Sequence, residues 1–316
     1  MTTRFLMERS DRLRMTFEGA QAKAALNGLL TNEVTALVEG GGQYAAALTA
    51  KGRVHALCRV MDRGSDCLVD TEAAAAEGFV GMIKKYVNPR LARYAVITES
   101  TGCLGVRGDG AAAAIAAWGG GEAEAIEGLT PLGGCWVTPG EQRTWVVRAR
   151  DTATPGFDCI GDRATIDALR EGLLAAGWPM ATASQQLAER IAAGVPAWGV
   201  EMNDETIAQE ACLDTLGAIS FAKGCYTGQE VVARIHFRGH VNRLLRWVDS
   251  ATALPVGAVL LNAEGAEVGE VRSSVVRANG EAIGIAMVRR EIAPGTSLSV
   301  RDGASVTATV REITPG

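Results

Sequence analysis

The spacing of apolar residues changes near residue 240, and this change constrains the fold more than any other feature of the sequence. Beyond it, short apolar runs are separated by Gly, Pro or Asn turns, and no helical period of useful length appears. Six runs predict strands: Leu244–Val248, Val259–Leu261, Glu267–Val276, Ile283–Met287, Ser297–Val300 and Ser305–Arg311. Six short strands within about 70 residues are typical of a small β-barrel or sandwich. We therefore expect a C-terminal β-barrel over residues 241–316, with its boundary between Gly239 and Asn242.

Residues 1–240 follow a different pattern, in which pairs of strands alternate with helices. Glu72–Val87 is the clearest helix, because apolar residues recur along one stripe and Asn88-Pro89 ends it. Asp162 and Ser184 are expected to cap the N-termini of two further helices. Strand-strand-helix groups of this size predict ferredoxin-like α+β units. The expected fold class is therefore α+β, with two interleaved subdomains ahead of the barrel.

The charge balance argues against a nucleic-acid or membrane partner. The chain carries 31 Lys and Arg against 36 Asp and Glu, a formal net charge of −5 with a pI of about 5.4. Such a chain has no broad basic field for polyphosphate or anionic lipid. No apolar stretch approaches the ~18 residues that span a bilayer, and the N-terminal residues lack the apolar core of a signal peptide. We expect a cytoplasmic protein without direct nucleic-acid or membrane contacts.

The cysteines and histidines do not form a metal-binding pattern. The seven cysteines are widely scattered and no CxxC pair occurs, so the usual ligand spacing for zinc or an iron–sulfur cluster is absent. Most of these cysteines are expected to be small buried residues. His236 and His240 have no Cys or carboxylate at matching spacing, and we interpret them as part of a solvated turn. No metal is predicted.

One segment, KGCYTGQEVVAR at residues 223–234, combines residues that suggest chemistry. Two glycines bracket Cys225 and allow a tight turn, while Lys223 lies two residues away and would favour thiolate over thiol. If the end of the segment is helical, Glu230 and Arg234 are four residues apart and can form an ion pair. The residues alone allow two interpretations: a presented reactive thiol, or a glycine turn with a buried cysteine and a surface ion pair.

The same segment resembles the signature of the YgfZ family of folate-binding proteins, which are related to the aminomethyltransferase of glycine cleavage. The family pattern is K-G-C-[YF]-x-G-Q-E followed by an arginine. The matching positions are Lys223, Gly224, Cys225, Tyr226, Gly228, Gln229, Glu230 and Arg234. Further stretches that resemble the family are Gly19–Val34, Leu48–Val54, Pro196–Glu201, Gln209–Ala211 and Gly269–Ser274. The resemblance covers nearly the whole chain.

This resemblance implies a cloverleaf fold in which α+β subdomains and a terminal β-barrel surround a central channel that holds tetrahydrofolate. It also implies a role in assembly or repair of iron–sulfur clusters, including those of tRNA-modifying enzymes. The resemblance links Cys225 alone to this role, and Lys223 is the residue that we expect to assist it, because a nearby ammonium favours the thiolate. Implied folate-binding residues are Asn32, Glu201, Glu210, Tyr226, Gly228, Gln229, Glu230 and Arg234. Expected partners are folate or a similar flat heterocycle, and iron–sulfur proteins or their assembly factors.

Two departures from the family pattern keep alternatives open. The stretch 52–57 has no carboxylate where the aminomethyltransferases have one, which argues against iminium chemistry. Ala192 stands where the family has a glutamate that binds the pterin. A carboxylate suits the amidine edge of a pterin well, so its absence here argues against folate binding. Besides the folate-binding maintenance protein, two functions therefore stay open: a folate-dependent one-carbon transferase, and a thiol-redox or scaffold protein that has lost folate.

Overall fold

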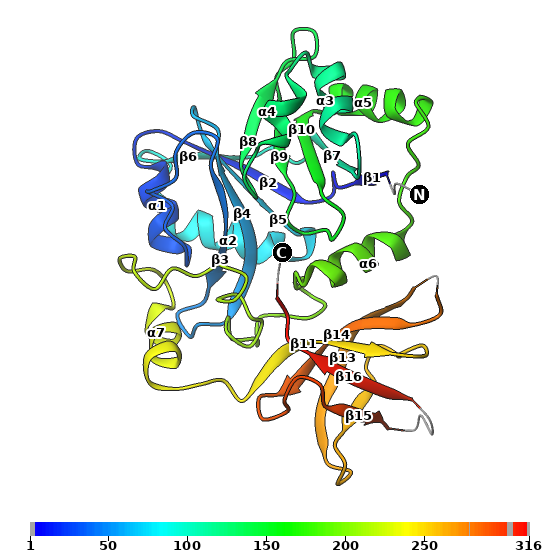
Figure 1. Cartoon of the computed structure of the whole chain (residues 1–316). Helices are drawn as coiled ribbons and strands as arrows, with labels where there is room; N and C mark the ends of the chain where they lie inside the picture. Colours follow the sequence, from blue (N-terminus) through cyan, green and yellow to red (C-terminus); the bar gives the residue numbers. More distant parts are fainter. Residues whose placement is uncertain (1–3, 278, 302–305, 315–316) are drawn as a thin grey trace.

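The computed structural model describes residues 4–277, 279–301 and 306–314, which form two five-stranded sheets and a closed barrel (Figure 1). In the view of Figure 1 the two sheets lie side by side above the barrel. Within the described residues, every helix is too short or too polar to cross a bilayer.

The first sheet has the strand order β3-β4-β5-β2-β6, and all its neighbouring strands are antiparallel. Its elements are β2 (Leu13–Glu18), α1 (Ala22–Leu29), β3 (Gly42–Leu48), β4 (Val54–Asp62), β5 (Cys67–Thr71), η1 (Ala73–Ala75), α2 (Ala76–Tyr86) and β6 (Arg93–Val96). Side chains alternate between the two faces of a strand. On β3, Ala45 and Ala47 pack in the core that contains Leu26 of α1 and Phe79 of α2. Tyr44 lies in a different core cluster, so its side chain faces away from the two helices.

The second sheet has the order β1-β7-β10-β9-β8 and is also antiparallel. Its elements are β1 (Phe5–Glu8), β7 (Thr101–Arg107), α3 (Ala111–Gly119), α4 (Ala123–Glu127), β8 (Gly134–Val137), β9 (Thr144–Arg148), β10 (Gly156–Asp162) and α5 (Arg163–Ala175). Strand β1 comes first in the chain but pairs with β7, after the whole first sheet has been built. The two sheets are therefore interleaved in sequence.

Buried ion pairs join the two sheets. Arg59 on β4 donates to Asp70 on β5 at 2.9 Å and to Asp158 on β10 at 2.5 Å. Arg107 on β7 donates to the other oxygen of Asp158 at 2.6 Å. All four side chains are essentially inaccessible to solvent. Because a buried charge is tolerated only with good partners, these residues hold the sheets in one relative position.

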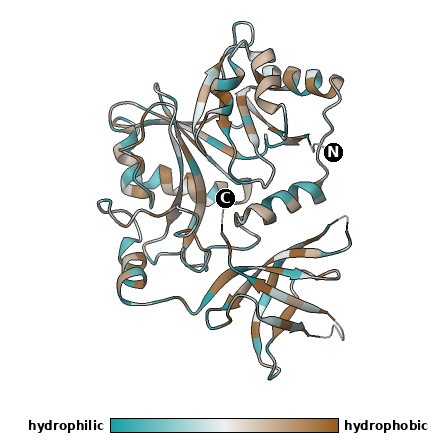
Figure 2. Cartoon of the chain, viewed as in Figure 1, coloured by the Kyte–Doolittle hydropathy of each residue, from teal (hydrophilic) through white to brown (hydrophobic). Residues whose placement is uncertain are grey.

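The C-terminal barrel is closed, with the order β11-β14-β13-β12-β15-β16. Its strands are β11 (Arg243–Ser250), β12 (Val259–Leu261), β13 (Glu267–Val276), β14 (Ala282–Arg289), β15 (Ser297–Val300) and β16 (Thr307–Arg311). This confirms the predicted barrel; the start of the last predicted strand, Ser305, lies outside the described residues. Figure 2 shows hydrophobic and hydrophilic residues interspersed along these strands, as expected for walls with one buried face.

Two helices connect the sheets to the barrel, α6 (Ala183–Ala193) and α7 (Gln229–Arg238). The prediction that Asp162 caps α5 is confirmed, since its side chain accepts from the amide groups of Ala164 and Thr165. The prediction that Ser184 caps α6 is wrong. Thr182 is the N-cap and accepts from the amide of Gln185 at 3.2 Å. A threonine supplies the same hydroxyl acceptor two residues earlier, so the helix starts there.

Candidate functional site

The signature segment forms an exposed loop, Lys223–Gly228, that leads into α7 (hereafter the signature loop). Cys225 is exposed at its centre, whereas Lys223 and Tyr226 on either side are buried. All seven cysteines lie in the described residues; five of the others are buried and Cys135 is half-buried. The loop therefore presents one thiol to solvent between two anchored side chains.

The Lys223 ammonium is the first anchor. Its Nζ donates to the main-chain oxygens of Asn27 and Leu30 at 2.7 Å and of Asn32 at 2.8 Å, at the C-terminal end of α1. An ammonium has three N–H donors, and all three are used here, so none remains for the Cys225 thiol. Burial lowers the pKa of Lys223 to about 8, with Glu33 opposing the shift. In this geometry the lysine holds the loop against α1.

Gly228 forms the second attachment of the loop, against the turn between β3 and β4. Its φ of +85° belongs to the left-handed region that glycine adopts without strain. A Cβ at this position would lie 2.5 Å from the carbonyl oxygen of Thr49 and 3.4 Å from the Cα of Gly52. Gly52 has a similar constraint, since a Cβ there would meet Val231 of α7 at 2.9 Å. The two glycines thus let the signature loop and the β3–β4 turn pack backbone to backbone.

The remaining signature residues lie on or near the first turns of α7. Gln229 donates to the carbonyl of Gly224 at 3.4 Å and closes the loop. Glu230 and Arg234 are both exposed, and the ion pairs found among the described residues do not include one between them. The expected pairing is therefore not formed, which is consistent with the small energy of solvent-exposed ion pairs. Burial raises the pKa of Tyr226 to about 12, so its phenol stays protonated.

Asn32, Glu201 and Glu210 each hold protein elements together. The Asn32 amide donates to the carbonyls of Tyr44 at 2.8 Å and Gly217 at 2.9 Å. Glu201 accepts two hydrogen bonds of 2.9 Å from the Arg190 guanidinium on α6 and a further one from Ser273 on β13. It therefore connects the helix to the barrel.

Glu210 has a similar position near the start of the barrel. It accepts from Arg243 of β11 at 2.9 Å and from the amide of Ile207 at 3.1 Å. The oxygens of both carboxylates are thus engaged by neighbouring groups of the protein, and their predicted role in binding folate stays a prediction.

The larger cavity has a volume of about 480 Å³ and lies between the two sheets and α6. Its wall includes residues from β1, β3, β4 and the segments that follow β1, β5 and α6, among them Arg9, Tyr44, Glu72, Asp151, Trp198 and Val200. Among the described residues that line it, none is a signature residue or another of the predicted folate-binding residues. The structure thus places the exposed thiol and this cavity at separate sites.

Glu72 and Asp151 are acidic groups in this wall that the sequence pattern does not single out. Glu72 accepts a hydrogen bond from the amide of Trp198, and burial raises its pKa despite the attraction of Arg12. Glu72 follows a buried strand directly, a position that could have suggested it. Asp151 and Tyr44 carry no comparable signal in the sequence, because only the tertiary fold brings them to one cavity.

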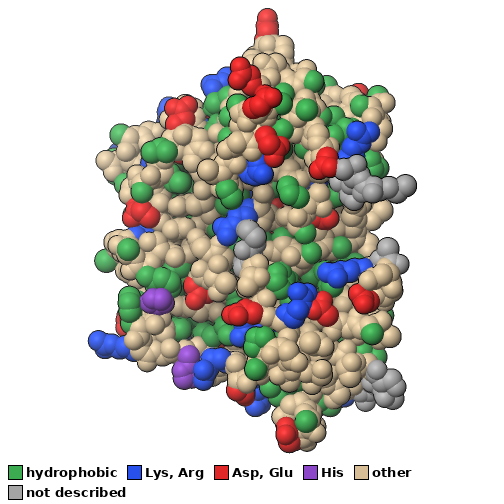
Figure 3. Space-filling view, viewed as in Figure 1, with side chains coloured by type: hydrophobic (Ala, Val, Ile, Leu, Met, Phe, Trp, Pro, Cys, Tyr) green, Lys and Arg blue, Asp and Glu red, His purple; other side chains and the backbone are tan. Residues whose placement is uncertain are grey.

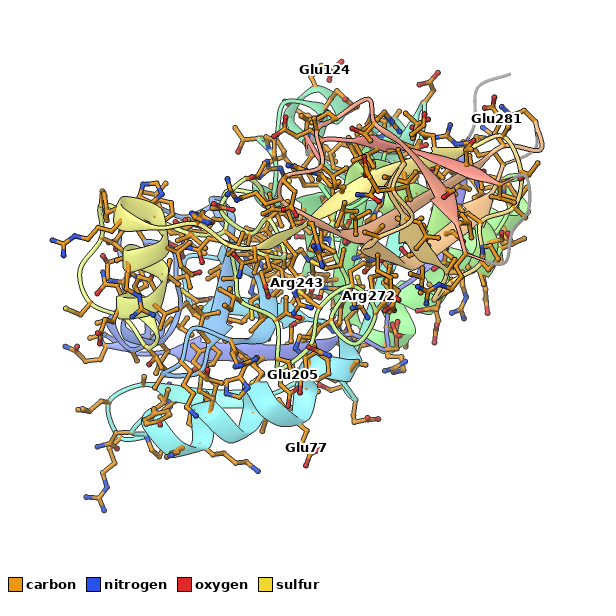
Figure 4. All side chains as sticks on the ribbon, turned by 90° about the horizontal axis from the view of Figure 1, so that it is seen from below. Glu77, Glu124, Glu205, Arg243, Arg272 and Glu281 are labelled. Atoms are coloured by element: carbon orange, nitrogen blue, oxygen red, sulfur yellow. The ribbon has the colours of Figure 1, made fainter. Side chains whose placement is uncertain are left out.

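A second, more polar cavity of about 270 Å³ lies where the barrel meets the segment after α6. It contains Glu201, Glu205, Arg243 and Arg272 in its wall. Figure 4 shows Glu205, Arg243 and Arg272 close together in the view from below, although they come from three different parts of the chain. Opposite charges therefore face one another at the junction between the barrel and the rest of the molecule.

The surface of α7 carries aromatic and basic side chains. The ring of Phe221 stacks on His236 with centroids 3.6 Å apart, and Phe237 is 68% exposed beside them. Figure 3 shows blue and purple side chains together at the lower left, where Figure 1 places α7. Within the described residues, no three His, Cys, Asp or Glu side chains come together in a way that could hold a metal ion.

Comparison with known proteins agrees with this architecture. The GCVT N-terminal domain family matches residues 3–221, and the CAF17 C-terminal beta-barrel domain family matches residues 242–316. The tRNA-modifying protein YgfZ of Escherichia coli O157:H7 is 30% identical over 311 residues, which cover 95% of this chain and 90% of that protein. The protein of the same name from Shigella boydii serotype 4 is 29% identical with the same coverage.

Among solved structures, the glycine cleavage system aminomethyltransferase T from Bartonella henselae matches with a TM-score of 0.86. The match covers 99% of this chain and 86% of that one at 18% identity, which shows a shared fold. The expected α+β fold with a terminal barrel is thereby confirmed, and the chain belongs to the GCVT domain family, among the YgfZ proteins.

Proposed function

We propose that this chain is a tetrahydrofolate-binding protein that supports assembly or repair of iron–sulfur clusters, among them clusters of tRNA-modifying enzymes, through Cys225. The curated relatives are named tRNA-modifying proteins, which supports the last part of the proposal. The observation that carries it is the exposure of Cys225, when the other six cysteines are buried or half-buried.

The construction of the signature loop suits a thiol that acts on a partner. A thiolate is the form of cysteine that attacks electrophiles and binds metals, and it must be reachable to do either. Lys223 and Gly228 fasten the loop to α1 and to the β3–β4 turn, so Cys225 stays exposed without a rearrangement of the chain. The neighbouring α7 surface offers aromatic and cationic side chains to the same partner.

The larger cavity suits a flat heterocycle by size and by the chemistry of its wall. Its volume of about 480 Å³ lies within the roughly 300–1,000 Å³ common for small-molecule sites. Tyr44 and Trp198 supply aromatic surface, and Glu72 supplies a carboxylate in a chain that has Ala192 where the family places one. Bound tetrahydrofolate would supply a carrier for a one-carbon unit, and these three residues would hold its ring.

The thiol part of the proposal is tested in cells that lack the endogenous protein. Wild type is expected to restore modification of tRNA by an iron–sulfur enzyme, and Cys225→Ser is expected not to. Cys135→Ser, at the half-buried cysteine, is the matched control and should restore it. Full restoration by Cys225→Ser at equal protein level would refute the role of the thiol.

The folate part is tested separately by calorimetry with tetrahydrofolate. Saturable heat with one site per chain is expected for wild type and for Cys225→Ser alike, because Cys225 does not line the larger cavity. No heat at millimolar ligand would remove folate from the proposal and favour a thiol-redox or scaffold protein.

A further inference from the structure

Residues 78–98 gather basic side chains without an acidic one, although the whole chain has a net charge of −5. They contain four Lys or Arg and no Asp or Glu. The structure places this stretch at the C-terminal end of α2, in the turn that follows and on β6. The exposed basic and large apolar side chains around that turn, hereafter the basic patch, are Lys84, Lys85, Tyr86, Arg90, Leu91 and Arg93.

The basic patch is open to a large partner. Tyr86 is 55% exposed, Leu91 is 60% exposed and the Arg93 side chain is 77% exposed. Strand β6 is the last strand of its sheet, with β2 as its neighbour. Figure 4 shows α2 along an outer edge of the molecule with Glu77 near one end, and the patch begins at the other end.

A short turn connects the two halves of the patch. The amides of Leu91 and Ala92 both donate to the carbonyl of Asn88 at 3.0 Å. The Asn88 side chain accepts from the amide of Arg90, also at 3.0 Å. The backbone is therefore ordered between the end of the helix and β6, and it keeps the cations of both within a few residues of one another.

Most of these cations lack an acidic partner. Among the described residues, no ion pair includes Lys84, Lys85 or Arg90. Arg93 pairs with Glu18 at 2.8 Å, but the pair lies in solvent and such pairs contribute little. Lysines in the last turn of α2 suit the helix dipole, yet this does not account for Arg90, which lies beyond the helix. The patch is thus a local concentration of positive charge.

We propose that the basic patch binds the phosphate backbone of tRNA, with one base stacked on Tyr86. Several unpaired cations suit closely spaced phosphates, and an exposed aromatic ring accepts a base of any sequence. The net charge of the chain does not oppose this binding, because exposed charges more than about 8 Å apart are largely screened at physiological salt. The choice of tRNA among polyanions rests on the proposed function.

The first test measures binding of a fluorescently labelled tRNA to the full chain by anisotropy at about 50 and 200 mM KCl. Four phosphate contacts predict that the affinity of wild type falls about 50- to 150-fold over this range. Lys84→Gln/Lys85→Gln retains two of the four cations, so its affinity should fall only about 7- to 12-fold. Lys51→Gln/Arg290→Gln removes the same charge from exposed positions outside the patch and should behave as wild type does.

The second test concerns stacking on Tyr86. Tyr86→Ala should weaken binding about fivefold or more without changing its salt dependence, because a stacked base releases no counterions. Tyr86→Phe keeps the aromatic ring and should bind as wild type does. Equal affinities of Tyr86→Ala and wild type would remove the stacked base from the proposal.

Equal salt dependence in the two double variants would overturn the inference. Displacement of tRNA by poly-L-glutamate at equal charge would also overturn it and would indicate an acidic protein as the partner. Cys225→Ser should bind tRNA as wild type does. Absence of tRNA binding in wild type would therefore overturn the inference and leave the proposed function intact, whereas restoration of tRNA modification by Cys225→Ser would do the reverse.

Discussion

Arg59 on β4 and Asp158 on β10 form a fully buried ion pair of 2.5 Å that crosses from one sheet to the other. Asp158 also accepts from Arg107, so both of its oxygens are occupied. Removing the charge from one member of such a cluster leaves its partners buried and unpaired, which costs more than the ion pair itself contributes.

Asp158→Asn is therefore expected to lower the free energy of unfolding by about 3 to 5 kcal/mol. Burial acts to raise the pKa of Asp158, but Arg9, Arg107 and Arg59 outweigh it and hold the pKa well below the ordinary value. The unfolded carboxyl binds protons first as pH falls, so the stability that Asp158 contributes is present above about pH 4 and is lost below it.

Urea unfolding of wild type and Asp158→Asn from pH 3 to 7 checks this expectation. Glu18→Gln is the control, because Glu18 pairs with Arg93 at an exposed position and should change stability by no more than about 1 kcal/mol. A difference between wild type and Asp158→Asn that stays constant below pH 4 would contradict the assignment.

Gly228→Ala should destabilise the protein, because its Cβ would lie 2.5 Å from the Thr49 carbonyl and its φ is +85°. We expect a loss of about 1 to 3 kcal/mol in the free energy of unfolding. Gly224→Ala in the same loop is the matched control: the added Cβ would meet open space and should change stability by no more than about 0.5 kcal/mol. Equal losses of unfolding free energy in the two variants would show that the close approach of Gly228 to the Thr49 carbonyl does not determine the stability of the loop.

Lys223→Met should leave three carbonyls at the end of α1 without their donor and cost about 1 to 3 kcal/mol at pH 7. The folded pKa of about 8 is below the ordinary lysine pKa of 10.5, so the unfolded chain binds the proton more tightly. Wild type should therefore gain stability relative to the variant as pH rises from 8 to 10.5.

Chemical denaturation of wild type and Lys223→Met from pH 8 to 10.5 measures the difference between their free energies of unfolding. Lys51→Met, at an exposed lysine, should change stability by less than about 0.5 kcal/mol at pH 7. A wild-type advantage that falls between pH 8 and 10.5 would contradict the prediction.

Thiol titration distinguishes Cys225 from the other cysteines. In the folded protein one thiol per chain should react rapidly with a disulfide reagent, because Cys225 is exposed and the others are buried or half-buried. Unfolding should release all seven. Cys225→Ser should lose the rapid phase, and its persistence in that variant would place the reactive thiol elsewhere.

The barrel and the signature loop could be predicted from the sequence because their signals are local. Strands β13 and β15 alternate buried residues with more exposed ones between turn residues, and Asp162 lies directly before its helix. The cap of α6 is harder to predict because Thr182 and Ser184 offer the same chemistry two residues apart, and only the backbone conformation distinguishes them.

The cavity could not be predicted in the same way. Tyr44 and Asp151 are 107 residues apart in sequence and belong to different sheets, and each looks ordinary in its own segment. Their relation appears only when the buried cluster around Arg59 and Asp158 sets one sheet against the other. A sequence pattern of period two or 3.6 carries no information about that arrangement.

The early position of β1 has a consequence for synthesis of the protein. Phe5–Glu8 is translated about 100 residues before its partner Thr101–Arg107, an interval of roughly 5 to 20 seconds at common elongation rates. During that interval β1 has no partner strand, so the second sheet cannot close before β7 has been synthesised.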